Sequence, residues 1–163
     1  MKVEFADAEK KLFEYAVKKV VEYNTLRHEK GFIDTLYSFI QTEDGNFYDG
    51  GVFEPNIAQA TVCGERVAMS NMTMREGNNA KIKSIVVLDP VPNVQSRSTP
   101  PCGTCRHLIW QFSTPGTSVI LGQYIQQNEG GKLSWNFPVE SLEKYVIAEL
   151  YPHPYEPNPN LWK

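Results

Sequence analysis

Apolar residues recur at helical spacing near the start of the chain. Over residues 3–26 they lie three or four positions apart, with Lys and Glu between them. This spacing predicts an amphipathic helix. Two strand-like runs follow at 34–41 and 46–53, and the Asp44-Gly45 step between them is a strong hairpin signal. We therefore expect the first helix to lead into a two-stranded antiparallel unit.

Further along, helical and strand-like patterns alternate. The predicted elements are a helix over 61–76, a strand over 82–88, a helix over 101–113, a strand over 117–125, a turn or hairpin over 126–136 and a helix over 139–150. Thr61 is a candidate N-cap for the second helix, and Ser98 or Thr99 for the third. Alternation of this kind predicts an α/β fold in which helices cover a mixed sheet.

Length and composition narrow the class of protein. At 163 residues and 18.5 kDa the chain is predicted to form one domain over 1–163, with a proline-rich tail over 151–163 that lacks regular structure. A net charge of −3 argues against a nucleic-acid binder that works through bulk positive charge. There is no signal-peptide pattern and no apolar run of about 18 residues, so we expect no membrane span. An odd count of three cysteines favours a reducing cytoplasm.

The three cysteines are the candidate chemical groups. Cys63 and Cys102 lie at predicted helix starts, where free N–H groups and the helix dipole favour the thiolate. Cys105 follows one turn after Cys102, and this spacing lets both sulfurs reach one ion. Three ligands leave a tetrahedral zinc one open position, which is typical of catalytic sites. Filling of the core by small apolar side chains, and a closed site with a histidine as fourth ligand, are the alternatives.

Glu65 lies two residues after the first cysteine, where a carboxylate could take a proton from a metal-bound water. Cys63-x-Glu65 followed by Pro101-Cys102-x-x-Cys105 resembles the zinc-dependent cytidine deaminase superfamily. The segments "CGER" and "PCGTCR" carry the resemblance, and a cysteine as first ligand is similar to the small cytidine deaminases and the blasticidin-S deaminases.

The resemblance implies a fold, a cofactor and residue roles. The fold would be a three-layer α/β/α sandwich around a mixed sheet of about five strands. Cys63, Cys102 and Cys105 would bind one Zn²⁺ per chain, and Glu65 would shuttle protons. The backbone of Gly64 would contact the pyrimidine ring. The Arg66 guanidinium would donate hydrogen bonds to the ligand sulfurs and offset their excess negative charge. A homo-oligomer, tetramer or dimer, is also implied, and the aromatic tail would suit its interface.

Upstream of the first cysteine the chain departs from this family. The family carries an N-x-E segment that holds the ribose, and here the segment reads "GGVFEPN". Glu54 matches the glutamate, but Val52 stands where the asparagine is expected, and Asn56 could replace it. Phe53, Glu54 and Asn56 are the candidate substrate contacts. The family's small first strand is replaced by "LYSF", whose Tyr37 and Phe39 are expected to reshape the pocket floor.

These observations predict a hydrolytic deaminase that converts a cytidine-type nucleoside to its uridine-type product and releases ammonia. A modified cytidine, a blasticidin-like nucleoside or another amino-heterocycle is the alternative substrate. A non-catalytic, zinc-stabilised binding protein is the second alternative. The partner is expected to be a small molecule rather than a membrane or a nucleic acid.

Overall fold

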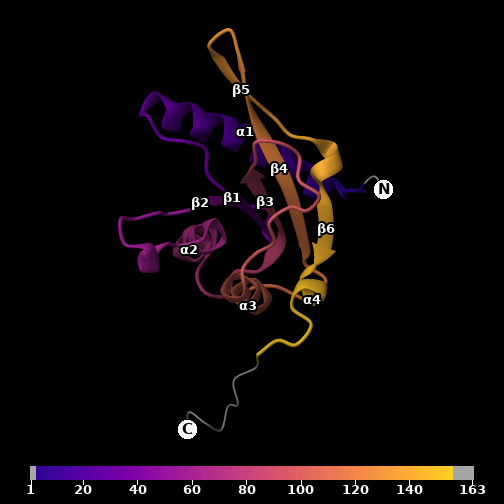
Figure 1. The fold of residues 1–163 in the computed structure, drawn as a ribbon. Coiled ribbons are helices and arrows are strands. Elements are labelled where there is room, and N and C mark those ends of the chain that lie inside the picture. Colours follow the sequence, from indigo (N-terminus) through magenta and orange to yellow (C-terminus); the bar gives the residue numbers. More distant parts are fainter. Residues whose placement is uncertain (1–2, 156–163) are drawn as a thin grey trace.

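A six-stranded sheet forms the centre of the computed structural model, which describes residues 3–155 (Figure 1). Its strands are β1 (Tyr37–Thr42), β2 (Phe47–Gly51), β3 (Ile82–Pro90), β4 (Ser118–Glu129), β5 (Lys132–Asn136) and β6 (Glu143–Val146). The helices are α1 (Asp7–Glu29), α2 (Gly64–Glu76), α3 (Gly103–Gln111) and α4 (Ile147–Leu150), with short 3₁₀ turns η1 (Ala58–Ala60) and η2 (Val139–Ser141).

The sheet is mixed, as predicted. Its order is β2-β1-β3-β4-β5, and β6 pairs with the other part of β4. Only the β3–β4 pair is parallel among these strands. The predicted β1–β2 hairpin is confirmed, and Gly45 takes the positive φ of 86° that its turn requires.

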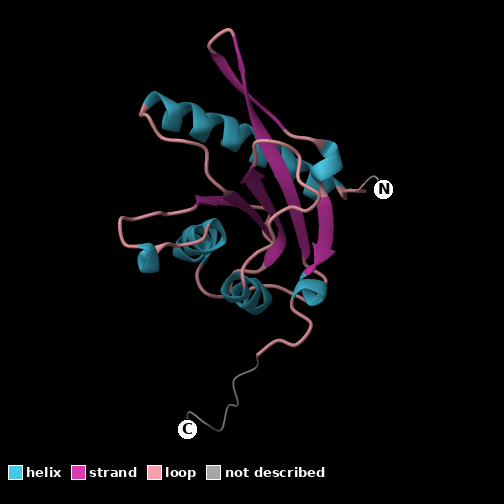
Figure 2. Ribbon diagram, in the orientation of Figure 1, coloured by secondary structure: helices cyan, strands magenta, loops and turns pink. Residues whose placement is uncertain are grey.

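Helices cover both faces of the sheet (Figure 2), which confirms the three-layer arrangement. On one face α1 buries Leu12, Ala16 and Val20 against alternate residues of the central strands. On the other face α2 and α3 pack on the sheet with residues such as Met72 and Ile109. Alternation along the strands separates the two cores, because successive side chains point to opposite faces.

The first helix was predicted over 3–26, and both of its ends lie three to four residues further along the chain. It begins at Asp7 and ends at Glu29. The start is fixed by Glu9, whose carboxylate accepts a hydrogen bond from the Ala6 backbone N–H at 2.8 Å. A local hydrogen bond therefore decides the boundary that the apolar spacing left open.

The two helices that carry the cysteines begin later than predicted. Cys63 is the N-cap residue of α2 in place of Thr61, and Cys102 is the N-cap residue of α3 in place of Ser98 or Thr99. The hydroxyls of Ser98 and Thr99 instead donate to groups of other elements. Each helix therefore starts directly after a cysteine.

The prediction of a helix over 139–150 is wrong. The segment is divided into η2, the strand β6 and a single helical turn, α4. Residues 143–146 pair antiparallel with β4, from Leu121↔Glu143 to Ser118↔Val146. Helical spacing in "VESLEKYV" is overridden because β4 offers a free edge whose backbone groups need partners.

The tail is described as far as Tyr155, so Leu161 and Trp162 of the tail predicted to suit an interface lie outside the described residues. Tyr151 and Tyr155 lie against His107 of α3, with ring centroids 5.9 and 6.1 Å away. Between residues 3 and 155, none of the helices has both the length and the apolar character that crossing a membrane requires.

Candidate metal centre

Two loops bring the cysteines to one face of the sheet. The loop after β2 is closed by a two-residue bridge, in which Phe53 and Val62 exchange backbone hydrogen bonds of 3.0 Å. Cys63 follows this bridge and starts α2. The loop after β3 leads to Cys102, which starts α3. Since both helices pack on the same face, their first turns meet, although the two cysteines are 39 positions apart in sequence.

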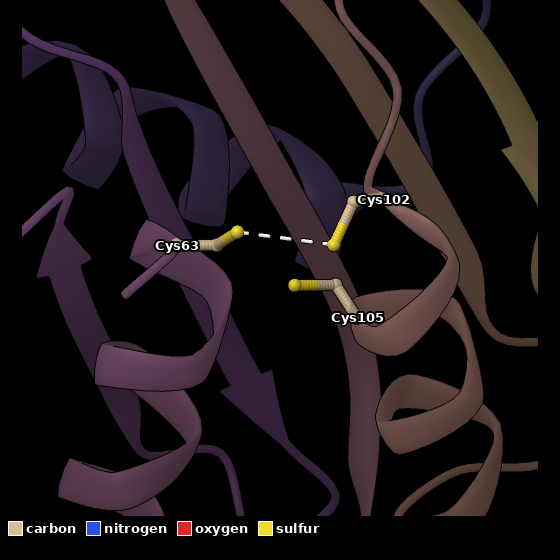
Figure 3. A group of neighbouring side chains, drawn as sticks. All are labelled: Cys63, Cys102 and Cys105. Atoms are coloured by element: carbon tan, nitrogen blue, oxygen red, sulfur yellow. Dashed lines mark hydrogen bonds between the residues drawn. The ribbon is translucent and has the colours of Figure 1, made fainter. Parts of the chain in front are cut away.

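The three thiols converge on one point between the helices (Figure 3). Their sulfurs all lie within 4.8 Å of one another, and the Cys63 and Cys102 sulfurs are 3.8 Å apart. A tetrahedral zinc with Zn–S bonds of about 2.3 Å places its sulfurs about 3.8 Å apart. Cys105 is fully buried, whereas Cys102 is exposed. The donor set therefore fits a thiolate-preferring ion and leaves one side accessible.

The helix starts and one guanidinium act on the charge of the thiols. Burial would raise the pKa of Cys102, but the backbone N–H of Cys105 and the neighbouring thiols lower it below its ordinary value. Burial and the nearby Glu65 carboxylate raise the pKa of Cys105. The Arg66 guanidinium lies 4.0 Å from the Cys63 sulfur, and that contact raises the pKa of Arg66. Arg66 therefore lies where a cation would offset the excess charge of three thiolates.

Glu65 presents a buried carboxyl in the first turn of α2. The residue is 3% exposed, and burial raises its pKa, although its own backbone N–H, the Ser38 hydroxyl and Arg66 act in the opposite direction. Its Oε2 atom is buried without a hydrogen-bond partner among the described residues. A buried carboxylate oxygen with no partner is costly, so this atom marks a place for a polar ligand such as water.

The position of α2 depends on Gly50 and Gly64, whose close approach is not visible in the sequence. A Cβ on Gly50 would lie 2.4 Å from the Ala68 nitrogen and 2.5 Å from the Gly64 oxygen. A Cβ on Gly64 would lie 2.9 Å from the Gly50 oxygen. The first turn of α2 therefore rests directly on the backbone of β2, and Cys63 and Glu65 are placed by that contact.

A polar network that the sequence did not reveal fixes the loop before Cys102. The Ser98 backbone N–H donates to the Glu143 carboxylate at 2.7 Å. The Gln123 amide donates to the carbonyl oxygens of Gln95 and Arg97, and its Oε1 accepts from the Gln95 N–H. Because the partners are some 26 to 45 positions apart, no local pattern could have indicated them.

The predicted substrate contacts lie on the loop between β2 and α2. Phe53 is 56% exposed, and Glu54 and Asn56 are exposed as well. The bridge to Val62 brings Phe53 next to the residue that precedes Cys63. Their role in binding substrate stays a prediction.

The expectation that Tyr37 and Phe39 reshape the pocket floor is wrong. Both side chains are buried on the α1 face, in the core with Leu12 and Ala16. The cysteines lie on the opposite face. Because side chains alternate along a strand, Ser38 rather than its two aromatic neighbours faces α2.

Comparisons with known proteins support the predicted fold. No protein-family model and no curated protein matches the sequence. The structure is similar to the cytidine deaminase from Burkholderia pseudomallei, with a TM-score of 0.57 and 18% identity over 85% of this chain and 98% of that one. The cytidine deaminase from Bacillus anthracis gives 0.53 and 16%, over 86% of this chain and 88% of that one. That from Mycobacterium leprae gives 0.53 and 14%, over 83% and 97%. The chain shares the cytidine deaminase fold, as the sequence motifs predicted.

Proposed function

We propose that this protein is a zinc-dependent hydrolase that deaminates a cytidine-type nucleoside. The observation that carries the proposal is the pairing of a three-thiol cluster with the buried Glu65 carboxyl, which lies two residues after Cys63 and whose Oε2 atom has no partner among the described residues. A zinc-stabilised binding protein would have no use for such a carboxyl, and burying it costs stability. The shared fold with cytidine deaminases supports the same chemistry.

Cys63, Cys102 and Cys105 would hold the ion, whose contribution is to make water a good nucleophile near neutral pH. Glu65 takes a proton from the attacking water and passes it to N3 of the base. The water oxygen adds to C4, Glu65 then takes the proton of the new C4 hydroxyl and passes it to the exocyclic amine, and the C4–N4 bond breaks as the C4 carbonyl forms. Cytidine and water thereby give uridine and ammonia.

The remaining residues orient the substrate and balance charge. The Gly64 backbone lies in the same turn as Glu65 and would contact the base. Glu54 would hold the sugar, with Phe53 beside it and Asn56 as a substitute for the expected asparagine. Arg66 would donate to the Cys63 sulfur, from which it lies 4.0 Å away. Because Val52 replaces the ribose-binding asparagine, a modified cytidine or blasticidin-like nucleoside is the second candidate substrate.

The test is the variant Glu65→Gln, assayed for zinc content and for ammonia release from a panel of nucleosides. We expect one zinc per chain to be retained and turnover to fall by at least about 10³-fold, since the proton carrier is lost. Glu129→Gln is the matched control, because Glu129 is an exposed carboxylate on the β4–β5 hairpin. It should keep both zinc and activity.

The panel contains cytidine, deoxycytidine, blasticidin S and free cytosine. Preference for cytidine or deoxycytidine would support the first substrate, and preference for blasticidin S the second. Zinc-loaded protein that releases no ammonia from any member would contradict the proposal, as would full turnover by Glu65→Gln.

A further inference from the structure

Ser38 lies on β1 directly beneath the first turn of α2. It is fully buried, and in the sheet it stands opposite Gly50 of β2 and Val87 of β3. Val87 belongs to the core on the α2 and α3 face, so Ser38 faces the same way. A Cβ on Gly64 would lie 3.2 Å from the Ser38 hydroxyl oxygen and 3.4 Å from its backbone nitrogen. The hydroxyl therefore lies at the turn that carries Glu65.

The Ser38 hydroxyl and one oxygen of the Glu65 carboxyl each lack a partner. Ser38 Oγ and Glu65 Oε2 are both inaccessible to solvent and make no hydrogen bond with the described residues. Leaving either one unpaired costs about 1–3 kcal/mol. A hydroxyl donates, whereas a carboxylate only accepts, so the two groups are complementary.

The neighbouring Arg66 side chain is only partly engaged, since its Nε atom is buried without a hydrogen-bond partner among the described residues. The Arg66 guanidinium donates to the Thr61 carbonyl at 3.2 Å and lies against the Cys63 sulfur. Ser38 belongs to the strand β1, whereas Arg66 belongs to α2 itself. A donor on β1 is fixed by the sheet and does not move with the helix.

We propose that Ser38 is a positioning residue for Glu65: in the zinc-loaded protein its hydroxyl would hydrogen-bond the carboxyl and hold it in the rotamer that points at the thiol cluster. This inference rests on the proposed function. A hydroxyl can donate to a carboxylate and accept from a carboxylic acid. The bond therefore persists when Glu65 carries the proton, and the side chain need not reorient between proton uptake and release.

The test uses Ser38→Ala with Ser84→Ala as its matched control. Ser84 is also a buried strand serine, 1% exposed, with an unpartnered hydroxyl. It stands opposite Gln41, in step with Phe39, and so faces α1 on the far side of the sheet. Both variants remove one buried hydroxyl, but only one of them removes a neighbour of Glu65.

The first readout is structural and needs no substrate. Crystal structures of zinc-loaded wild type and Ser38→Ala are compared at the Glu65 carboxyl. We expect Ser38 Oγ within about 2.8 Å of a carboxyl oxygen in the wild type, and more than one Glu65 rotamer in Ser38→Ala with zinc content unchanged. A wild-type carboxyl out of reach of Ser38, or one unmoved in Ser38→Ala, overturns the proposal.

The second readout is turnover of the substrate identified by the panel. Ser38→Ala should lower kcat about tenfold with KM unchanged, which is the usual size for a residue acting through another. Ser84→Ala should change neither. Equal losses in both variants would indicate general loosening of the core and overturn the proposal. If wild-type protein deaminates nothing, the proposed function fails, while the crystal structures still decide the role of Ser38.

Discussion

At the scale of single residues, the surroundings of Gly50 leave no space for a side chain. The Cβ of an alanine there would lie 2.4 and 2.5 Å from two backbone atoms of α2, which cannot rotate away as a side chain can. Gly50→Ala should therefore push the first turn of α2 off β2. We expect a loss of about 3 kcal/mol in the free energy of unfolding and at least about tenfold weaker zinc binding, because Cys63 moves with that turn.

Urea denaturation and competition with a chelator measure the two effects of Gly50→Ala. Gly116→Ala is the control, since a Cβ there meets nothing within 4 Å and lies outside the helices and strands. It should leave stability within about 0.5 kcal/mol and zinc affinity unchanged. If Gly50→Ala binds zinc as tightly as the wild type, the contact between β2 and α2 does not position Cys63.

The cluster of three thiols was predictable at this scale because its cysteines lie in two short segments. The spacing of Cys63, Cys102 and Cys105 predicts a candidate metal site before the fold is known. Ser38 was not predictable, because the strand pattern does not say which face of β1 meets α2. Its bulky neighbours Tyr37 and Phe39 were expected to face the site, but they face α1.

At the scale of elements, β6 supports the loop that delivers Cys102. Glu143 accepts hydrogen bonds from the Ser98 N–H at 2.7 Å and from the Tyr145 hydroxyl at 2.5 Å. Removal of the carboxylate in Glu143→Ala frees the loop at Ser98, four residues before Cys102. We expect zinc affinity to fall about tenfold, as for other groups that hold ligands in place, with the fold retained.

Zinc affinity of Glu143→Ala is best compared with that of Glu140→Ala. Glu140 is an exposed residue in η2, three positions away. Circular dichroism checks that both variants fold. The support by β6 would be refuted by equal zinc affinity in Glu143→Ala and wild type, or by an equal loss in Glu140→Ala.

Elements were predictable where their pattern and their surroundings agree. The run over 82–88 is apolar apart from Lys83 and Ser84, and it forms the central strand β3, which extends to Pro90. The segment over 139–150 carries a helical pattern, but its surroundings provide an open edge of β4 at Ser118–Leu121. Long-range pairing is invisible to a local pattern, and here it also determines which residues reach the metal centre.

At the scale of the whole molecule, an ion pair links α1, the first helix of the described residues, to β6, their last strand. Lys144 of β6 donates to the Glu9 carboxylate of α1 at 2.7 Å, across 135 positions of sequence. The Glu9 side chain is 8% exposed and the Lys144 side chain 30%. This pair therefore joins the start of α1 to the strand that supports the loop before Cys102. Its loss should lower the free energy of unfolding of the whole domain.

The pair also makes stability depend on pH. Burial would raise the pKa of Glu9, but hydrogen bonds from Lys144, Ser118 and the Ala6 N–H lower it below its ordinary value. A depressed pKa in the folded state contributes stability above the unfolded value of about 4.3, and this contribution disappears as pH falls through the folded pKa. Glu9→Gln should therefore cost about 1–2 kcal/mol at pH 7 and much less near pH 3.

Urea denaturation at a series of pH values between 7 and 3 measures this difference. The control is Glu14→Gln, which removes an exposed carboxylate from the same helix. Its stability should follow the wild type at every pH, because an exposed carboxylate has nearly the same surroundings in the folded and unfolded chains. A Glu9→Gln curve that stays parallel to the wild type down to pH 3 would show that the pair does not couple stability to protonation. A curve that converges on the wild type in acid, while zinc binding at pH 7 weakens, would show that the α1–β6 link also helps to hold the metal-centre loop.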